Sequence, residues 1–220
     1  MIGWHTLAAE GSELYSPIGF RLLDNLTSKG PIGKVESELD LKDAGGAWRT
    51  TDIKPVVTLS GILAYPALER RADVVGQPPR RYRARLKADY YIPLYRRTRD
   101  GIEFDAFPYN DTNPPAVITT SPMSVILVPA TNYPFPTHLR VLRGVVVDVL
   151  GNPVSDVEVR LSNIERVITD EKGNYGLPIR WAQNGTSLNI DADHARTNRS
   201  GMITVTLPQD LGASQRITIF

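Results

Sequence analysis

The stretch LRGVVVDVLGNPVSDVEVRLSNIERVITDEKGNYGLPI (Leu142–Ile179) decides the fold, because its short apolar runs alternate with turn residues. Val145, Val147 and Val149 recur with a period of two, which indicates a strand buried on at least one face. Residues 151–153, Gly-Asn-Pro, end this strand with turn chemistry. The stretch therefore begins as a strand followed by a turn.

A second strand follows from the same alternation. Val157, Val159 and Leu161 share one face, and we expect the intervening polar residues to face solvent. These polar residues are Asp156, Glu158, Arg160 and Ser162. Residues 170–174 form a further turn, in which Gly173 can take a positive φ at low cost, before a third strand. The order strand, turn, strand, turn, strand predicts an antiparallel β-domain.

One motif in this stretch has a family likeness. The pattern G-x-V-x-D-x-x-G-x-P-V-x-x-V-x-V followed by T-D-x-x-G-x-Y resembles the carboxypeptidase regulatory-like domain, a seven-stranded transthyretin-like β-sandwich, over roughly residues 139–220. The residues that carry it are Gly144, Val146, Asp148, Gly151, Pro153, Val154, Val157, Val159, Thr169, Asp170, Gly173 and Tyr175. The resemblance implies an accessory module for scaffolding or binding. It does not imply peptidase activity, because His5, His138 and His194 lack the H-x-x-E context of a zinc site.

Composition places the chain among ordinary globular proteins. Its 220 residues suffice for one large or two small domains. Lys and Arg total 25 against 24 for Asp and Glu, so net charge offers no general attraction to nucleic acid or anionic membranes. The chain has no cysteine, which excludes disulfides and thiolate metal sites. Its 17 Pro and 17 Gly argue against long helices.

The first residues, MIGWHTLAAEGSE, lack the basic region and apolar core of a secretory signal. No apolar run approaches the length of about 20 residues that a membrane helix needs. We therefore expect a cytoplasmic protein without a membrane segment. Residues 1–13 read as an N-terminal arm in which Trp4 docks either on a neighbour or on its own domain.

The first half of the chain echoes the second. Residues 22–26 and 30–39 repeat the order of strand, Gly, Pro and apolar residues found at 146–161, and 60–65 match 172–177. Residues 82–89 have a counterpart in 187–193. We interpret the halves as two diverged copies of one sandwich, with insertions at 43–55 and 69–80 in the first. Shared turn residues in two unrelated β-domains remain the alternative.

Three prolines in residues 129–136 mark the boundary, since such a segment favours extended, stiff backbone. We predict an all-β protein of two tandem Greek-key or transthyretin-like β-sandwiches joined by a Pro-rich linker. The expected units are a first sandwich over 14–129, the linker over 130–138 and a second sandwich over 139–220. The last strand runs to Phe220 and is a candidate for pairing with another chain at a sheet edge.

An Arg-rich run between Glu69 and Arg99 holds ten bases and three acids, with tyrosines interleaved. Arg81, Arg83 and Arg85 fall on one strand face by alternation, with Lys87. This face could be a solvated surface, a protein interface or a contact for nucleic acid. Arg and Tyr are both favoured in protein interfaces. We expect no nucleic-acid partner. Interface candidates are Trp4, Arg81, Arg83, Arg85, Tyr91, Arg96, Arg97 and Phe220.

Other chemistry is weakly signalled. Two groups of acidic and amide residues could offer oxygen atoms to calcium, but neither has the spacing of a calcium loop. They are Asp105, Asn110, Asp111 and Asn113, and Asp191 with Asp193. There is no nucleophile elbow, P-loop or dinucleotide fingerprint, and although two acids could meet in a groove, no pair is indicated. We predict no enzyme activity, no cofactor and no metal.

The order of the segments PVVTLSGILAYPALERR, DGIEFDAFPYNDTNPP and NYPFP, leading into the second domain, also resembles accessory proteins of phage tails and contractile injection systems. This resemblance implies a non-enzymatic structural component of a tail, baseplate or cap. Its partners would be other protein subunits, with several copies in each virion or injection particle. The alternative is a carbohydrate-binding or adhesin-like module with Trp48, Tyr65 and Tyr109 as exposed stacking platforms.

Overall fold

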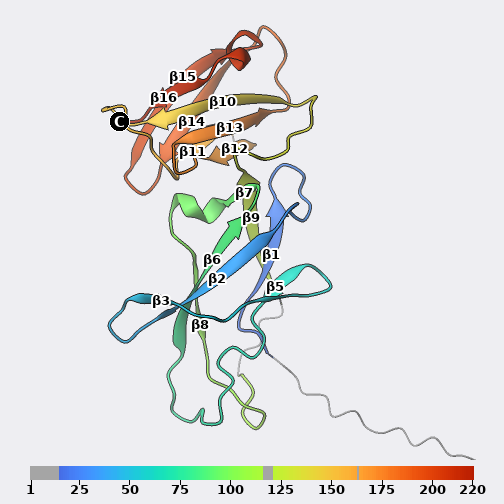
Figure 1. The fold of residues 1–220 in the computed structure, drawn as a ribbon, viewed down its shortest axis with the longest axis vertical. Coiled ribbons are helices and arrows are strands. Elements are labelled where there is room, and N and C mark those ends of the chain that lie inside the picture. Colours follow the sequence, from blue (N-terminus) through green and yellow to red (C-terminus); the bar gives the residue numbers. More distant parts are fainter. Residues whose placement is uncertain (1–14, 116–120, 163) are drawn as a thin grey trace, which may run out of the picture.

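The computed structural model describes residues 15–115, 121–162 and 164–220. The chain is all-β, as predicted, and its strands form two tandem β-sandwiches (Figure 1). Within the described residues the helices are two short 3₁₀ turns, η1 (Leu94–Arg97) and η2 (Gln209–Gly212). The frequent Pro and Gly residues account for this, because they interrupt helical hydrogen bonding.

The first sandwich pairs a five-stranded sheet with a four-stranded sheet. The five-stranded sheet has the order β4-β5-β1-β9-β7, and the four-stranded sheet has the order β3-β2-β6-β8. The strands are β1 (Gly19–Asp24), β2 (Val35–Lys42), β3 (Trp48–Thr50), β4 (Val56–Val57), β5 (Ile62–Ala64), β6 (Arg80–Ala88), β7 (Tyr91–Pro93), β8 (Ile102–Ala106) and β9 (Met123–Pro129).

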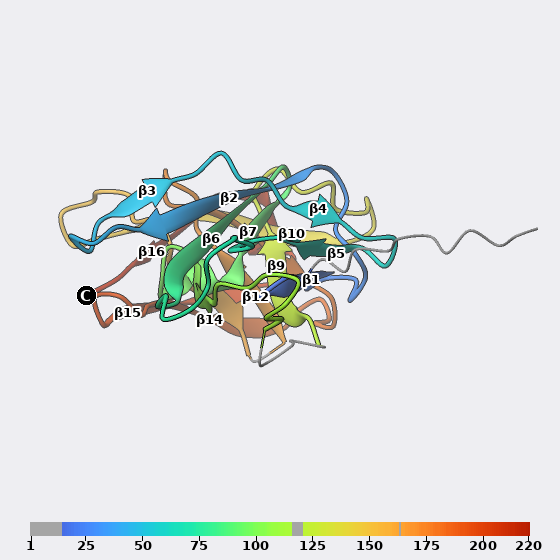
Figure 2. The ribbon, with the colours of Figure 1, turned by 90° about the horizontal axis from the view of Figure 1, so that it is seen from below.

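The second sandwich pairs a three-stranded sheet, β13-β10-β16, with a four-stranded sheet, β12-β11-β14-β15. Figure 2 shows the same layers from below. The strands are β10 (Arg140–Val147), β11 (Glu158–Leu161), β12 (Glu165–Ile168), β13 (Asn174–Ile179), β14 (Ser187–His194), β15 (Arg199–Thr206) and β16 (Gln215–Thr218).

The two sandwiches share one topology. In each, the first strand lies between an antiparallel strand and a parallel one: β1 between β5 and β9, and β10 between β13 and β16. The orders β3-β2-β6-β8 and β12-β11-β14-β15 also correspond strand by strand. The strands matched by the sequence repeat are equivalent in space, as two copies of one sandwich require. The segment expected to be an insertion at 43–55 contains β3, which is the equivalent of β12.

The matching turns use the same chemistry. After β1, Asp24 accepts a hydrogen bond from the Leu26 amide at 2.7 Å, and after β10, Asp148 accepts one from the Leu150 amide at 2.9 Å. Such local bonds hold the chain in a turn because the side chain replaces a backbone partner. The repeat therefore extends from strand order to turn geometry.

Each sandwich encloses its own core, and the cores fill equivalent space differently. Where β1 meets β5, Phe20 lies opposite Leu63. Where β10 meets β13, Gly144 lies opposite Tyr175, so the large residue has moved to the other strand. A Cβ atom at Gly144 would lie 2.0 Å from the Gln215 carbonyl oxygen and 2.5 Å from the Tyr175 hydroxyl. Only glycine fits there.

The Pro-rich segment between the sandwiches packs on the first one. Tyr133 is buried, and its ring and that of Phe135 lie 4.8 Å apart. The Tyr133 hydroxyl donates a hydrogen bond to Asp24 at 3.0 Å. The segment is thus fixed by side-chain anchors in addition to the stiffness of its prolines.

Candidate protein-interaction surfaces

The Arg-rich run lies on β6, in the middle of the four-stranded sheet of the first sandwich. As the alternation predicted, Tyr82, Ala84 and Leu86 are buried in the core while the arginines face outward. The register places each outward arginine opposite an acid: Arg83 pairs with Asp40 on β2, and Arg81 with Asp105 on β8. This outward row of Arg81, Arg83 and Arg85 is called the arginine ladder below.

Within the ladder, Asp40 is the central acceptor. It is buried and accepts hydrogen bonds from Arg83 at 2.8 Å and from Arg85 at 2.8 Å. Burial alone would raise the pKa of Asp40, but the hydrogen bonds from the two arginines outweigh burial and lower it. Arg83 also lies 4.7 Å from the centre of the Trp48 ring. Trp48 is therefore partly covered by a fixed cation.

The third arginine of the ladder, Arg81, pairs with acids on β8, whereas Arg83 and Arg85 pair with Asp40 on β2. Arg81 contacts Asp105 at 3.0 Å and Glu103 at 3.2 Å. Because the charges of the ladder are matched by acids on the adjacent strands, the ladder offers little uncompensated charge to a phosphate backbone. Its geometry is that of a sheet-stabilising ion-pair network.

Arg96 and Arg97, on η1, contact the second sandwich. Arg97 donates a hydrogen bond to Glu158 at 2.7 Å, and Arg96 lies 3.1 Å from Asp156. In the reverse direction, Arg196 of the second sandwich donates to the Arg96 carbonyl oxygen at 2.6 Å. The two arginines that were expected to meet a neighbouring subunit are thus engaged within the chain.

An apolar cluster adjoins these ion pairs. Ile92 and Val128 of the first sandwich pack with Ile168 of the second, and all three are buried. The contact between the sandwiches also corrects one prediction. A solvated outer face was expected on β11, but Glu158 is buried because the first sandwich covers it. Charged residues on one sequence face do not reveal a docking partner from another domain, so sequence reasoning missed Glu158.

Tyr91 does not belong to an external interface. The structure places it inside the first sandwich, where it is buried and its ring lies 5.3 Å from that of Tyr133. Its hydroxyl donates to Asp24 and accepts from the Ile32 amide at 3.0 Å. Burial, followed by the hydrogen bond to Asp24, raises the pKa of Tyr133 above its ordinary value. These groups anchor the segment between the sandwiches.

The two remaining candidates lie at the ends of the chain. Phe220 is 75% exposed, while its backbone exchanges hydrogen bonds with Ser200 of β15. Its side chain is therefore available to a neighbour even though its backbone is partly paired. Trp4 lies outside the described residues.

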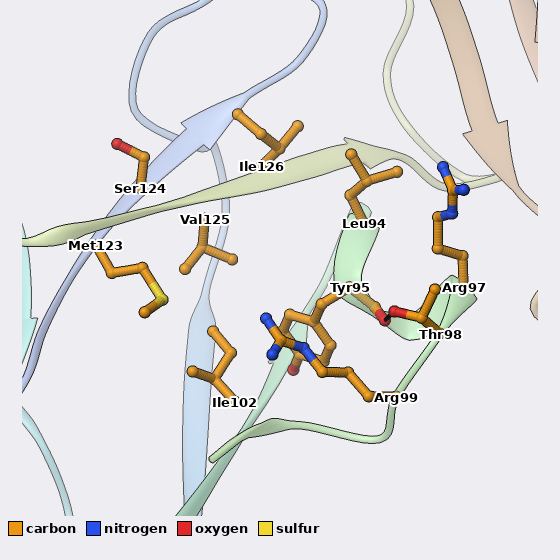
Figure 3. Close-up of a pocket in the computed structure, with 10 residues that line it drawn as sticks. All are labelled: Leu94, Tyr95, Arg97, Thr98, Arg99, Ile102, Met123, Ser124, Val125 and Ile126. Atoms are coloured by element: carbon orange, nitrogen blue, oxygen red, sulfur yellow. Dashed lines mark hydrogen bonds between the residues drawn. The ribbon is translucent and has the colours of Figure 1, made fainter. Parts of the chain in front are cut away.

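A groove lies beside η1 at the seam of the first sandwich (Figure 3). It has a volume of about 350 Å³ and no acidic residue in its lining. Its walls come from η1, the start of β8 and the first half of β9. The lining residues are Leu94, Tyr95, Arg97, Thr98, Arg99, Ile102, Met123, Ser124, Val125 and Ile126.

The opposite edge of the same five-stranded sheet is also apolar. Val56 and Val57 of β4 are exposed, as are Ile53 before the strand and Leu59 after it. A clustered set of exposed apolar side chains is typical of an interaction surface. No sequence periodicity marked this segment, because its strand has only two residues.

The aromatic rings proposed as stacking platforms are mostly inaccessible. Tyr65 and Tyr109 are buried, contrary to the expectation of exposed platforms. The Tyr65 hydroxyl lies 2.6 Å from that of Ser37 in the core, and Tyr109 packs edge-on against Tyr15. Tyr65 belongs to the apolar core of the first sandwich, and Tyr109 is buried against Tyr15.

Three of the four acidic side chains considered for calcium have an arginine partner. Asp105 and Asp111 bind Arg81 and Arg70, and Asp191 lies 3.8 Å from Arg160. Among the described residues, no group of three or more His, Cys, Asp or Glu side chains is placed to hold a metal ion. In the same part of the chain, no helix has the length and apolar character needed to cross a membrane.

Comparisons with known proteins find only distant structures. No protein-family model matches the chain, and no curated protein matches it. A streptococcal ancillary pilin aligns at 10% identity and a TM-score of 0.25, over 91% of this chain and 66% of the pilin. BcpA, the major pilin subunit of Bacillus cereus, aligns at 8% identity and a TM-score of 0.27, over 94% and 69%.

The chicken interferon gamma receptor alpha chain aligns at 12% identity and a TM-score of 0.23, over 96% of this chain and 95% of the receptor chain. The chain spans about two thirds of the length of the two pilins. Scores of this size establish neither a shared fold nor a shared activity. The functional argument therefore depends on the geometry of the chain itself.

Proposed function

We propose that the chain is a non-enzymatic structural subunit of a multi-subunit particle, of the phage-tail or contractile-injection type. Its partners would be other protein subunits, and several copies would be present in each particle. The second sandwich would serve as a carboxypeptidase regulatory-like scaffold module.

The observation that carries the proposal is the fixed contact between the sandwiches. Arg97 and Glu158 form an ion pair in which the Glu158 side chain is only 2% exposed. Breaking this pair leaves the buried Glu158 charge with Arg166 at 3.7 Å as its nearest cation, which is unfavourable. Together with the apolar cluster of Ile92, Val128 and Ile168, the pair joins the two sandwiches into one unit. A unit whose two domains keep one relative orientation suits a subunit that joins its neighbours at defined positions.

A further support is the exposed apolar segment around β4. Val57 is 68% exposed and Leu59 is fully exposed. These side chains would lose their contact with water in an assembly, which favours association by about 25 cal/mol per Å² of apolar surface. The segment belongs to a sheet edge, where a neighbouring subunit can approach.

The alternative of a carbohydrate-binding or adhesin-like module has less support. It required exposed rings at Tyr65 and Tyr109, and both are buried. Trp48 alone is accessible in part, and Arg83 lies over its ring. The burial of these two tyrosine rings favours the structural role.

Sedimentation of a native lysate through a density gradient, with mass spectrometry of the fractions, tests the proposal. We expect the untagged protein to migrate with a megadalton particle that contains tube or sheath proteins. Migration at about the mass of one chain, under conditions in which such particles are intact, would refute the structural role.

A matched pair of variants makes this test specific. We expect the double variant Val57→Ser, Leu59→Ser to melt normally but to be depleted from the particle fractions. Leu150→Ser is the control, because Leu150 is 82% exposed in a turn of the second sandwich, away from the β4 edge. Equal incorporation of all forms would exclude the β4 segment as a contact.

A further inference from the structure

We propose that the groove beside η1 binds an extended peptide segment that carries a carboxylate, and that the segment adds to the free edge of β9. The inference deepens the proposed function, because it names the surface through which a neighbouring subunit would insert a strand. The partner is identified by its chemistry: an apolar strand with an acidic residue.

The first argument is an incomplete strand ladder. β7 pairs only with the end of β9, from Leu127 to Pro129, because the chain turns into η1 after Pro93. The opposite side of β9 is fully paired with β1 from Met123 to Leu127. The start of β9, from Met123 to Val125, is therefore paired with β1 on one side, and none of the described strands pairs with it on the other.

The register shows which backbone groups are open. The Leu127 carbonyl oxygen accepts from the Asn25 amide, so Leu127 points its backbone groups toward β1. By alternation along a strand, Ser124 and Ile126 point theirs away from β1. The pairing of Pro93 with Leu127 already engages the Ile126 carbonyl oxygen, because Pro93 has no N–H and the ladder bond comes from the next amide, that of Leu94. The described strands pair with the outward groups of β9 no further than this, so the amide and carbonyl of Ser124 lie beyond the end of the β7 ladder. Amide and carbonyl groups at this spacing are matched by another strand.

The second argument is the apolar wall next to this edge. Figure 3 shows Met123, Val125 and Ile102 facing one space, with Tyr95 across from them. Met123 is 44% exposed there although it is a large apolar residue. Alternate side chains of an added strand would enter this space and cover Met123. The groove thus supplies both the ladder and the side-chain pocket that strand addition requires.

The third argument is charge. Arg97 and Arg99 border the groove, and Arg97 is already paired with Glu158. Arg99 is exposed and makes no ion pair with any residue that the structure describes. The groove lining contains no acid. A carboxylate on the incoming strand would complement Arg99 and select against a basic strand.

Fluorescence anisotropy with synthetic peptides tests the inference on the full chain. The probe is a fluorescein-labelled peptide, Thr-Val-Asp-Val-Thr-Ile, and its partner has Lys in place of Asp. We expect the acidic peptide to bind about tenfold more tightly than the basic one, and Arg99→Glu to reverse this preference. Absence of binding by the acidic peptide, or an unchanged preference in Arg99→Glu, would overturn the inference.

Two further measurements test the strand ladder itself. Ser124→Pro removes one outward amide while leaving the β1 side of β9 intact, so it should weaken binding about fivefold or more without changing the melting temperature. If that variant unfolds, a probe with N-methyl groups on alternate amides gives the same test on the ligand side. Two such probes can be made, one for each alternating set of amides, and strand addition predicts that only one of them loses affinity. Equal affinity of the two probes would contradict strand addition.

The outcomes separate this inference from the proposed function. If the protein sediments with particles but binds no peptide, the groove proposal is refuted and the structural role stands. If the protein binds the peptide but sediments as a single chain, the structural role is refuted and the groove proposal stands.

Discussion

The two sandwiches have the same strand order but are completed in different ways. The five-stranded sheet of the first adds β4 at one edge and β7 at the other, whereas β13-β10-β16 of the second has neither addition. On the other sheet, Arg81, Arg83 and Arg85 of β6 stand where β14 has Ser187, Asn189 and Asp191. Topology is thus shared, while edges and outer faces are specific to each copy. The surfaces proposed above as contacts, the β4 edge and the groove beside η1, each include an element that the second copy lacks.

The largest effect on stability should come from Gly144, the position at which the second core has glycine and the first has Phe20. Gly144→Ala places a Cβ atom 2.0 Å from the Gln215 carbonyl oxygen, and backbone cannot move away cheaply. We expect the second sandwich to lose more than about 3 kcal/mol of stability, measured by urea unfolding. Gly30→Ala is the control, because a Cβ atom there meets nothing within 4 Å. Similar losses in both variants would contradict the crowding argument.

The next effect on stability should come from Phe20, the large residue that lies on β1 in the first core, while the second core has its large residue, Tyr175, on the neighbouring strand. Phe20→Ala should destabilise the first sandwich by about 3–5 kcal/mol, since Phe20 is completely buried. Adding Leu63→Tyr places a large ring on the strand that carries Tyr175 in the second copy. We expect the double variant to recover about 1 kcal/mol relative to the sum of the single variants. A purely additive cycle would show that the two cores are not interchangeable in this way.

The contact between the copies should respond less strongly. Arg97→Ala leaves Glu158 with Arg166 at 3.7 Å as its nearest cation, so we expect a loss of about 1–2 kcal/mol. Small-angle scattering should also show a wider distribution of angles between the sandwiches. Arg99→Ala is the matched control two residues away, and it should change neither quantity.

The smallest effect concerns acid. Because the pKa of Asp40 is lowered in the folded chain, its carboxylate adds stability above about pH 4, the range of the unfolded group. That stability is lost as the pH falls through the lowered pKa. Asp40→Asn should therefore flatten the dependence of the first unfolding transition on pH below about 4. An unchanged slope would show that the arginine ladder does not set this titration.

Much of the fold follows from local sequence patterns. The alternation around Val157 predicts a strand that the structure contains, and the repeat predicts which strands are equivalent. Gly173 takes the predicted positive φ, in a turn that leads from β12 to β13 in the other sheet. These signals are local, because strand period and turn conformation depend on residues a few positions apart.

The surfaces were harder to predict because they depend on register and docking. No sequence pattern singles out Asp40, yet it joins Arg83 and Arg85 across a strand pair. Arg96 and Arg97 were recognised as contact residues, but their acceptors lie about sixty positions away in the other sandwich. The free edge of β9 could not be seen, since it depends on where β7 stops pairing.

The parallel pairing of the first and last strands of each copy has a mechanical consequence. Val145 of β10 lies beside Arg216 of β16, and Leu22 of β1 beside Val125 of β9, with both strands of each pair running the same way. Tension applied at the start of one strand and the end of its partner would pull them in opposite directions along their axes. The interstrand hydrogen bonds would then be sheared together instead of opening one after another. Each sandwich would therefore resist extension along the chain far better than peeling from an edge.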